Sequence, residues 1–341
     1  MIIAVDASGG DHAPHEIVKG AIKAAEDYGV EIALVGNKSI LHVQVARHLK
    51  QGKITIVDAP ETIDFGESPV KAVRTKLNSS IVVGINLVKE GAASAFVSAG
   101  SSGAVVMAAL FNLGTIEGIE RPPLASLISI NPVAPVLLID SGVNIDCRPN
   151  HLVQFAQLGT IYARYIMGIE TPRVGLLNNG EEESKGNRLA VEGHQLLKQT
   201  PDIKFIGNLE GQEILKGKAD IIVTDGFTGN VVIKTIEGLG DTFLLSLLNV
   251  GQLISSAYNV KGRIFLKDIG LSSWVSKMDY QEYGGACLLG VNGNVIVAHG
   301  RSQAKAIKNA ISLARQTAEQ DLARMIKEKA NIQKVDANNS H

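Results

Sequence analysis

The stretch that decides the fold runs from Ala95 to Leu110 and reads Ala-Phe-Val-Ser-Ala-Gly-Ser-Ser-Gly-Ala-Val-Val-Met-Ala-Ala-Leu. A short apolar strand stops at small residues, where Gly100 and Gly103 let the backbone turn and approach a ligand closely. Ser101 or Ser102 can cap the helix that follows. The first N–H groups of such a helix point at negative charge, so the turn predicts an anion site. Tight packing of an ordinary strand-to-helix turn is the alternative explanation for the small residues.

Two other strands end in the same way. Residues 1–14 read Met-Ile-Ile-Ala-Val-Asp-Ala-Ser-Gly-Gly-Asp-His-Ala-Pro, and residues 220–234 read Asp-Ile-Ile-Val-Thr-Asp-Gly-Phe-Thr-Gly-Asn-Val-Val-Ile-Lys. In an open parallel sheet the carboxyl ends of the strands lie at one edge, where ligands collect. We therefore expect all three turns along that edge. Asn230 and Lys234 are four residues apart and would share one helix face there.

Short strands rich in Val, Ile and Leu alternate with longer helical patterns along nearly the whole chain, which is typical of a doubly wound α/β fold. Strands are expected over residues 2–5, 31–35, 54–58, 95–97, 136–140, 173–177, 204–206, 221–224 and 295–297. The clearest helices are expected over residues 15–28, 81–89, 151–167, 187–199 and 303–329. Residues 1–329 are expected to form a single α/β domain, and residues 330–341 a disordered polar tail.

The composition is that of an ordinary globular protein and argues against several functions. The 341 residues are 45% hydrophobic and 20% charged, which suffices for a full core. A formal net charge of −1 and only 4% aromatic residues argue against nucleic acid as a partner. Cys147 and Cys287 show no metal-ligand spacing and the start shows no signal peptide, so a cytoplasmic location is expected. No apolar run is long enough to span a bilayer.

Residues 241–283 break the alternation of strands and helices. The apolar run from Ile264 to Leu266 is interleaved with Lys261, Arg263 and Lys267 on expected helices. This pattern suits a helical insertion that contacts a second subunit, an anionic membrane surface, or both. The same cations would also suit an acidic partner protein. A pair of helices packed on their own domain is the alternative.

The usual nucleotide and metal motifs are missing from the sequence. The first strand leads into Ala-Ser-Gly-Gly-Asp, without the Gly-x-Gly-x-x-Gly spacing of a dinucleotide site, and no phosphate-loop motif of NTPases occurs. Asp6, Asp11, His12 and His15 are potential metal ligands near one turn, but no second cluster of ligands accompanies them. We therefore expect no metal, and nucleotide chemistry has no support.

Lys185 stands out in a polar loop that follows another strand. Residues 174–187 read Val-Gly-Leu-Leu-Asn-Asn-Gly-Glu-Glu-Glu-Ser-Lys-Gly-Asn and lead into a helix. The three glutamates would repel an anionic ligand unless they face away from it. The lysine is a compact positive charge suited to phosphate or to a developing oxyanion. A solvated lysine paired with Glu181 or Glu182 is the alternative.

Several short stretches of the sequence, taken together, indicate a protein family far more specifically than any one of them does alone. They are residues 5–14, 98–104, 121–122, 140–144, 146–149, 151–156, 175–187, 225–230, 283–286 and 288–293. With these strings the chain resembles the bacterial phosphate acyltransferase family of phospholipid synthesis over nearly its whole length. That family resembles the isocitrate/isopropylmalate dehydrogenase and phosphotransacetylase folds, which implies a Rossmann-like α/β/α sandwich.

The resemblance implies an enzyme that converts acyl-acyl carrier protein and inorganic phosphate into acyl phosphate and free carrier protein, without a cofactor. The product would feed glycerol-3-phosphate acylation. We expect a homodimer in the cytoplasm, peripherally associated with the inner face of the membrane. The positions that depart from the family's usual residues are Ser8, Ser101, Ser102, Ser141, Val143 and Cys287. These small changes bear on substrate preference more than on the reaction.

On this interpretation phosphate is itself the nucleophile, so no acyl-enzyme intermediate is needed. The oxyanion would be met by a backbone amide or by Lys185. His12 would protonate the leaving thiolate, although a structural histidine fits that position equally well. Asp6 and Asp225 are expected to orient loop amides. The expected substrate-binding residues are Gly9, Gly10, Ser98, Gly100, Ser101, Ser102, Gly103, Asn144, Asn187, Gly226, Thr228, Gly229, Asn230 and Lys234.

Other functions stay open from the sequence. A phosphotransacetylase-like enzyme would perform the same chemistry on coenzyme A thioesters, and a non-catalytic scaffold would bind acyl carrier protein without turnover. A decarboxylating dehydrogenase would rest on analogy of fold alone. The sequence also leaves open the acyl-chain length, and which loop holds phosphate and which holds the phosphopantetheine arm.

Overall fold

The computed structural model describes residues 1–46, 48, 52–128, 135–240, 242 and 284–337. The strands are β1 (Ile2–Asp6), β2 (Glu31–Gly36), β3 (Ile54–Asp58), β4 (Ala95–Ser98), β5 (Leu124–Ile128), β6 (Val136–Ile139), β7 (Arg173–Asn178), β8 (Lys204–Glu210), β9 (Ile221–Val223), β10 (Ala286–Leu288) and β11 (Val295–Val297). The helices are α1 (His15–Tyr28), α2 (Lys38–Val45), α3 (Pro69–Thr75), α4 (Ser80–Lys89), α5 (Ser102–Asn112), α6 (Pro149–Tyr165), α7 (Arg188–Gln199), η2 (Gly211–Lys216, a 3₁₀ helix), α11 (Ala304–Glu319) and α12 (Leu322–Ala337). A further helix spans residues 226–240 and is called the β9 helix below.

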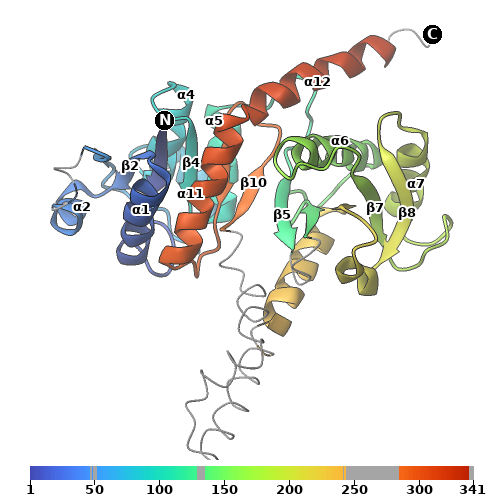
Figure 1. Cartoon of the computed structure of the whole chain (residues 1–341), viewed down its shortest axis with the longest axis horizontal. Coiled ribbons are helices and arrows are strands. Elements are labelled where there is room, and N and C mark those ends of the chain that lie inside the picture. Colours follow the sequence, from blue (N-terminus) through green and yellow to red (C-terminus); the bar gives the residue numbers. More distant parts are fainter. Residues whose placement is uncertain (47, 49–51, 129–134, 241, 243–283, 338–341) are drawn as a thin grey trace, which may run out of the picture.

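In the described part of the chain the strands form one 11-stranded sheet, in the order β3-β2-β1-β4-β11-β10-β5-β6-β9-β7-β8. Figure 1 shows β2 and β4 with α1, α2, α4 and α5 at one end of the molecule, and β7 and β8 with α6 and α7 at the other. The expected α/β sandwich is confirmed. The strands from β3 to β11 run parallel, as do β6, β9, β7 and β8.

Two strands at the middle of the sheet differ from the sequence prediction. β5 and β10 were not expected, and they pair antiparallel with each other, with β6 and with β11. β10 has three residues, which is too short to show an alternation, and β5 buries both ends without alternating. Their place is set by neighbouring strands and not by a local pattern. The sheet is therefore mixed, with an antiparallel centre between two parallel parts.

Helices cover both faces of the sheet. Ile3 and Val5 of β1 share one buried cluster with apolar residues of α1 and α11. Ala4 of β1 and Phe96 of β4 belong to a second cluster with residues of α4 and α5. Burial of alternate residues on both faces explains why the predicted strands are almost continuously apolar.

The C-terminal helical prediction needs one correction. The single helix expected over residues 303–329 is two helices, because α11 ends at Glu319 and Asp321 adopts a positive φ of 48° before α12. A residue in this left-handed conformation interrupts the hydrogen-bond ladder. The helix α12 runs on through residues 330–337, where the sequence predicts a polar tail.

The expected insertion over residues 241–283, with the dimer and membrane contacts predicted for it, lies almost entirely outside the described residues. None of the described helices is both long and apolar enough to cross a membrane.

Candidate active site

Asp6 ends β1 and ties the turn after β1 to the turn after β4. Its Oδ1 accepts the backbone N–H groups of Ser8 and Gly9, each at 3.0 Å. Its Oδ2 accepts the Ser98 hydroxyl at 2.6 Å, and Ser98 Oγ accepts the Gly100 N–H at 3.0 Å. Burial raises the pKa of the Asp6 carboxyl, while the hydrogen bonds oppose that rise. These contacts are those of a residue that orients loop amides.

The turns after β1, β4 and β11 touch one another. A Cβ on Gly9 would lie 2.7 Å from the Cα of Gly100, so these two turns meet through backbone atoms. Gly10 has a φ of 106°, and the next residue, Asp11, donates its N–H to the Gly300 carbonyl at 2.8 Å. The three strand ends thus share one edge, as parallel strands require. Gly300 was missed as a site residue, although it follows a predicted strand at that edge.

The start of α5 combines capping with close packing. Ser101 Oγ accepts the Ala104 N–H at 3.5 Å, and Ser102 is the exposed first residue of the helix. Gly103 lies against α3, because a Cβ there would come within 2.9 Å of Pro69 Cγ. Close packing therefore accounts for Gly103, whereas the cap and the free N–H groups beside it retain the form of an anion site.

A second buried aspartate, Asp140, organises the turn after β6. Its Oδ1 accepts the N–H groups of Gly142 at 3.3 Å and Val143 at 2.9 Å. Its Oδ2 accepts the backbone and side-chain N–H groups of Asn144 at 2.8 and 2.9 Å. Asn144 is among the binding residues predicted from the sequence, whereas Asp140 is not. The signal was available, since an aspartate that ends a strand before small residues is the pattern already recognised at Asp6.

Asp225 caps the β9 helix. Its Oδ1 accepts the Thr228 N–H at 2.9 Å, and its Oδ2 accepts the Thr228 hydroxyl at 2.7 Å. The carboxylate therefore fixes the first turn of the helix. A Cβ on Gly142 would lie 2.6 Å from Asn230 Nδ2, so Asn230 packs against the turn after β6.

The β9 helix also meets the turn after β6 through glycine. The Gly226 N–H donates to the Asn144 carbonyl at 2.8 Å. A Cβ on Gly229 would overlap the Asp140 carbonyl oxygen, so this contact excludes any side chain. The structure thus brings Asn144, Gly226, Gly229, Asn230 and Asp225 together, as expected for strand ends at one edge of a sheet.

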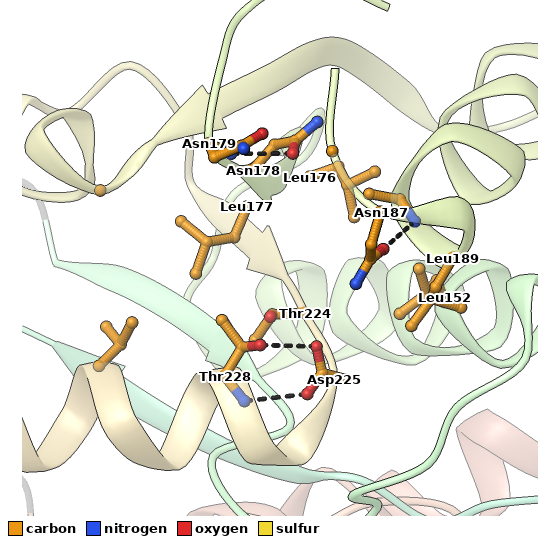
Figure 2. A pocket seen from close by; sticks show the side chains of 14 residues that line it. Leu152, Leu176, Leu177, Asn178, Asn179, Asn187, Leu189, Thr224, Asp225 and Thr228 are labelled. Carbon is orange, nitrogen blue, oxygen red and sulfur yellow. Dashed lines mark hydrogen bonds between the residues drawn. The ribbon is translucent and has the colours of Figure 1, made fainter. Parts of the chain in front are cut away.

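A pocket of about 440 Å³ lies between the β9 helix and the start of α7, and Figure 2 shows its side chains. Asn187 caps α7 by accepting the Ala190 N–H at 2.9 Å. Apolar and polar side chains both line the cavity. We call this cavity the strand-end pocket; its lining residues are Leu152, Leu176, Leu177, Asn178, Asn179, Gly186, Asn187, Leu189, Ala190, Gly211, Thr224, Asp225, Thr228 and Val232.

Lys185 is exposed near this pocket without lining it. Its N–H donates to the Glu182 carbonyl at 3.1 Å, and its carbonyl accepts the Asn178 Nδ2 group at 2.9 Å. Glu181 and Glu183 pair with other lysines. Within the described part of the chain, no carboxylate forms an ion pair with Lys185, so the alternative of pairing with Glu181 or Glu182 is not seen there.

His12 and Lys234 are exposed, and the structure brings neither into the hydrogen-bond networks around the aspartates. The remaining predicted residues form two groups, one around Asp6 and one around Asp225.

His299, which follows β11, extends from the first group toward the helix of the second, because its Nε2 lies 3.5 Å from Oε2 of Glu237 on the β9 helix. Glu237 lies about 18 Å from Asp225 along the helix axis, at 1.5 Å per residue.

Both cysteine thiols are held in their protonated form. Burial, together with the nearby charges of Asp140 and Asp225, raises the pKa of Cys147 to about 12. Burial alone raises the pKa of Cys287 to about 12. The nucleophilic form of cysteine is the thiolate, which is scarce at neutral pH in both positions.

If the chain transfers acyl groups, as its resemblance to the phosphate acyltransferase family implies, the double variant Cys147→Ser, Cys287→Ala should keep at least half of the parent's rate, because neither thiol is activated. Alanine is chosen at Cys287 because a serine hydroxyl would be buried there without a partner. Rates of thiol release from the acyl donor provide the measurement. Mass-spectrometric detection of an acyl group on either cysteine of the parent would contradict this expectation.

Comparison with known proteins identifies the family. A family model described as "Fatty acid synthesis protein" matches residues 1–325. The chain belongs to the fatty acid synthesis protein family. A member from Dehalococcoides mccartyi, named phosphate acyltransferase, is 56% identical over 96% of this chain and 94% of its own length. A phosphate acyltransferase from Pelotomaculum thermopropionicum is 49% identical over 94% of this chain and 93% of its own length.

Solved structures place this member of the fatty acid synthesis protein family in a wider fold group. A phosphotransacetylase from Streptococcus pyogenes has a TM-score of 0.60 at 20% identity and covers 94% of each chain. A branched-chain phosphotransacylase from Enterococcus faecalis has a TM-score of 0.58 at 13% identity, covering 93% of this chain and 99% of its own. These likenesses confirm the expected phosphotransacetylase-like fold.

Proposed function

We propose that this chain is a phosphate acyltransferase that converts acyl-acyl carrier protein and inorganic phosphate into acyl phosphate and free carrier protein. Membership of the fatty acid synthesis protein family, with close relatives named phosphate acyltransferase, supports the reaction. The observation that carries the proposal is the pair of buried aspartates, Asp6 and Asp140, which fix loop amides at the carboxyl edge of the sheet. The N–H groups that these carboxylates accept are already used, so the two aspartates hold the loops in shape, and other amides of the same loops would position a phosphate and stabilise an oxyanion.

In the proposed reaction a phosphate oxygen attacks the thioester carbonyl carbon of the acyl donor. The C–O bond forms, the carbonyl oxygen carries negative charge in the tetrahedral state, and the C–S bond then breaks. The thiolate of the phosphopantetheine arm leaves and takes a proton. Lys185 or a loop amide would stabilise the oxyanion, and His12 or water would supply the proton.

The direct test uses the purified chain with hexadecanoyl-acyl carrier protein and phosphate. We expect phosphate-dependent release of carrier-protein thiol, together with an acyl phosphate that hydroxylamine traps. Faster turnover with the coenzyme A thioester than with the carrier-protein thioester would support the phosphotransacetylase-like alternative. Binding of the carrier protein without any thiol release would support a scaffold.

Lys185→Ala should lower kcat by about one to three powers of ten, the range found for single oxyanion-stabilising groups. Lys185 is the lysine that the structure leaves exposed beside the strand-end pocket without a carboxylate partner among the described residues. Lys198→Ala is the matched control, because Lys198 is exposed and pairs with Glu183 at 2.6 Å. Equal rates of thiol release for the parent, Lys185→Ala and Lys198→Ala would assign Lys185 to the solvated surface.

We further propose that the chain is a homodimer on the cytoplasmic side of the membrane, with residues 241–283 providing the dimer and membrane contacts. The support is the sequence pattern, since each cation near an anionic leaflet adds about 1 kcal/mol of binding free energy. Replacing Ile264, Phe265 and Leu266 by Ser should release the chain from anionic vesicles while activity on a short soluble donor persists. Equal co-sedimentation of parent and variant would contradict the membrane contact, and light scattering tests the dimer.

A further inference from the structure

The strand-end pocket is unsuited to a phosphate dianion. Asp225 is the only charged side chain among the described residues that line it. Its carboxylate accepts two hydrogen bonds from Thr228, and the described residues that line the pocket include no lysine or arginine, since Lys185 lies exposed beside it. An approaching dianion would be repelled by the like charge. At the two helix starts beside this pocket, Asp225 accepts the Thr228 N–H and Asn187 accepts the Ala190 N–H.

The same walls suit a neutral ligand that carries both amide and alkyl groups. Asn187 uses its Oδ1 to cap α7, and its Nδ2 makes no hydrogen bond to a described residue. Figure 2 shows the Asn187 amide extending toward the space above Thr224 and Asp225. Leu177, Leu189 and Val232 supply apolar surface beside it.

We infer that the strand-end pocket takes the pantetheine arm of the acyl donor, and that phosphate binds outside this pocket. The arm is uncharged, carries two amides and has a dimethyl group, so it matches a pocket that is lined by both asparagine and leucine side chains. A volume of about 440 Å³ lies within the range typical of small-ligand sites. This inference rests on the proposed function, because a thioester on a pantetheine arm is the proposed donor.

The first experiment measures binding without turnover. Butyryl-pantetheine, in the absence of phosphate, should show saturation transfer from the parent protein to its methyl and amide-adjacent protons by NMR. Val232→Trp should weaken this binding at least tenfold, because Val232 lines the pocket. Val231→Trp is the matched control on the same helix, since Val231 is 51% exposed and lies outside the lining. Equal binding by the parent and both variants would overturn the inference.

The second experiment separates the two substrates. Asn187→Asp keeps an oxygen to cap α7 but removes the amide donor and adds negative charge to the pocket. The KM for the carrier-protein thioester should rise about tenfold, while the KM for phosphate stays within twofold of the parent. Asn37→Asp makes the same change at the cap of α2, outside the pocket, and should alter neither constant. A raised KM for phosphate with an unchanged KM for the donor would place phosphate in the pocket instead.

The two experiments also separate this inference from the proposed function. A parent that releases no thiol from any donor with phosphate refutes the proposed function, whatever the pocket binds. A parent that releases thiol normally, and whose Val232→Trp variant still binds butyryl-pantetheine with parental affinity, refutes only the assignment of the pocket.

Discussion

Gly229→Ala is expected to lower kcat/KM for the proposed acyl transfer by about 100-fold, the loss typical of a displacement near 1 Å at a site. A Cβ at this position would overlap the carbonyl oxygen of Asp140. The Cβ is attached directly to the backbone and the oxygen is part of it, so neither atom can rotate away. The β9 helix must therefore move off the turn after β6. We expect a loss of about 1 to 3 kcal/mol in the free energy of unfolding as well.

Gly238→Ala is the control for this prediction, because it makes the same change on the same helix. A Cβ on Gly238 would meet no heavy atom of the described residues within 4 Å. Alanine favours the helix over glycine by roughly 0.5 to 1 kcal/mol, so Gly238→Ala should be neutral or stabilising and fully active. Thiol-release rates and denaturant unfolding of the three proteins provide the comparison. Parental activity in Gly229→Ala would show that the contact with Asp140 does not position the site.

Asp6→Ala is expected to cost about 3 kcal/mol of folding free energy, since each buried donor left without a partner costs about 1 to 3 kcal/mol. The donors that lose their acceptor are the Ser8 and Gly9 N–H groups and the Ser98 hydroxyl. The gain from removing a carboxyl group whose pKa is raised by burial offsets part of this loss. Because the turns after β1 and β4 then separate, turnover should also fall by at least tenfold.

Asp58→Ala is the matched control for Asp6→Ala. Asp58 also ends a strand and accepts a backbone N–H, from Lys38 at 3.0 Å, but this hydrogen bond is exposed to solvent. Its loss should therefore cost less than about 1 kcal/mol and leave turnover unchanged. Chemical denaturation followed by circular dichroism measures both variants. Equal stability losses for Asp6→Ala and Asp58→Ala would show that the buried network adds nothing to an ordinary strand-end contact.

The local sequence pattern was sufficient to predict those parts of the structure that residues close together in the chain decide. Strands such as Ile3 to Val5 are apolar throughout because both faces of the sheet are covered. A continuous apolar run of this kind can be recognised in the sequence without knowledge of the fold. The caps at Ser101, Asn187 and Asp225 were also within reach, because a cap acts on N–H groups two or three residues ahead. Placing these turns at one edge then needed only the rule for parallel strands.

The sequence by itself determined an α/β sheet and the turns at its carboxyl edge, whereas the tertiary structure decided what those turns touch. Gly103 faces Pro69, and Gly229 faces Asp140, across separations of many residues. Such contacts depend on how distant segments pack, so no periodicity or local motif encodes them. The antiparallel centre of the sheet and the walls of the strand-end pocket arise in the same way. Each is built from strands and helices whose adjacency is fixed only when the whole core closes.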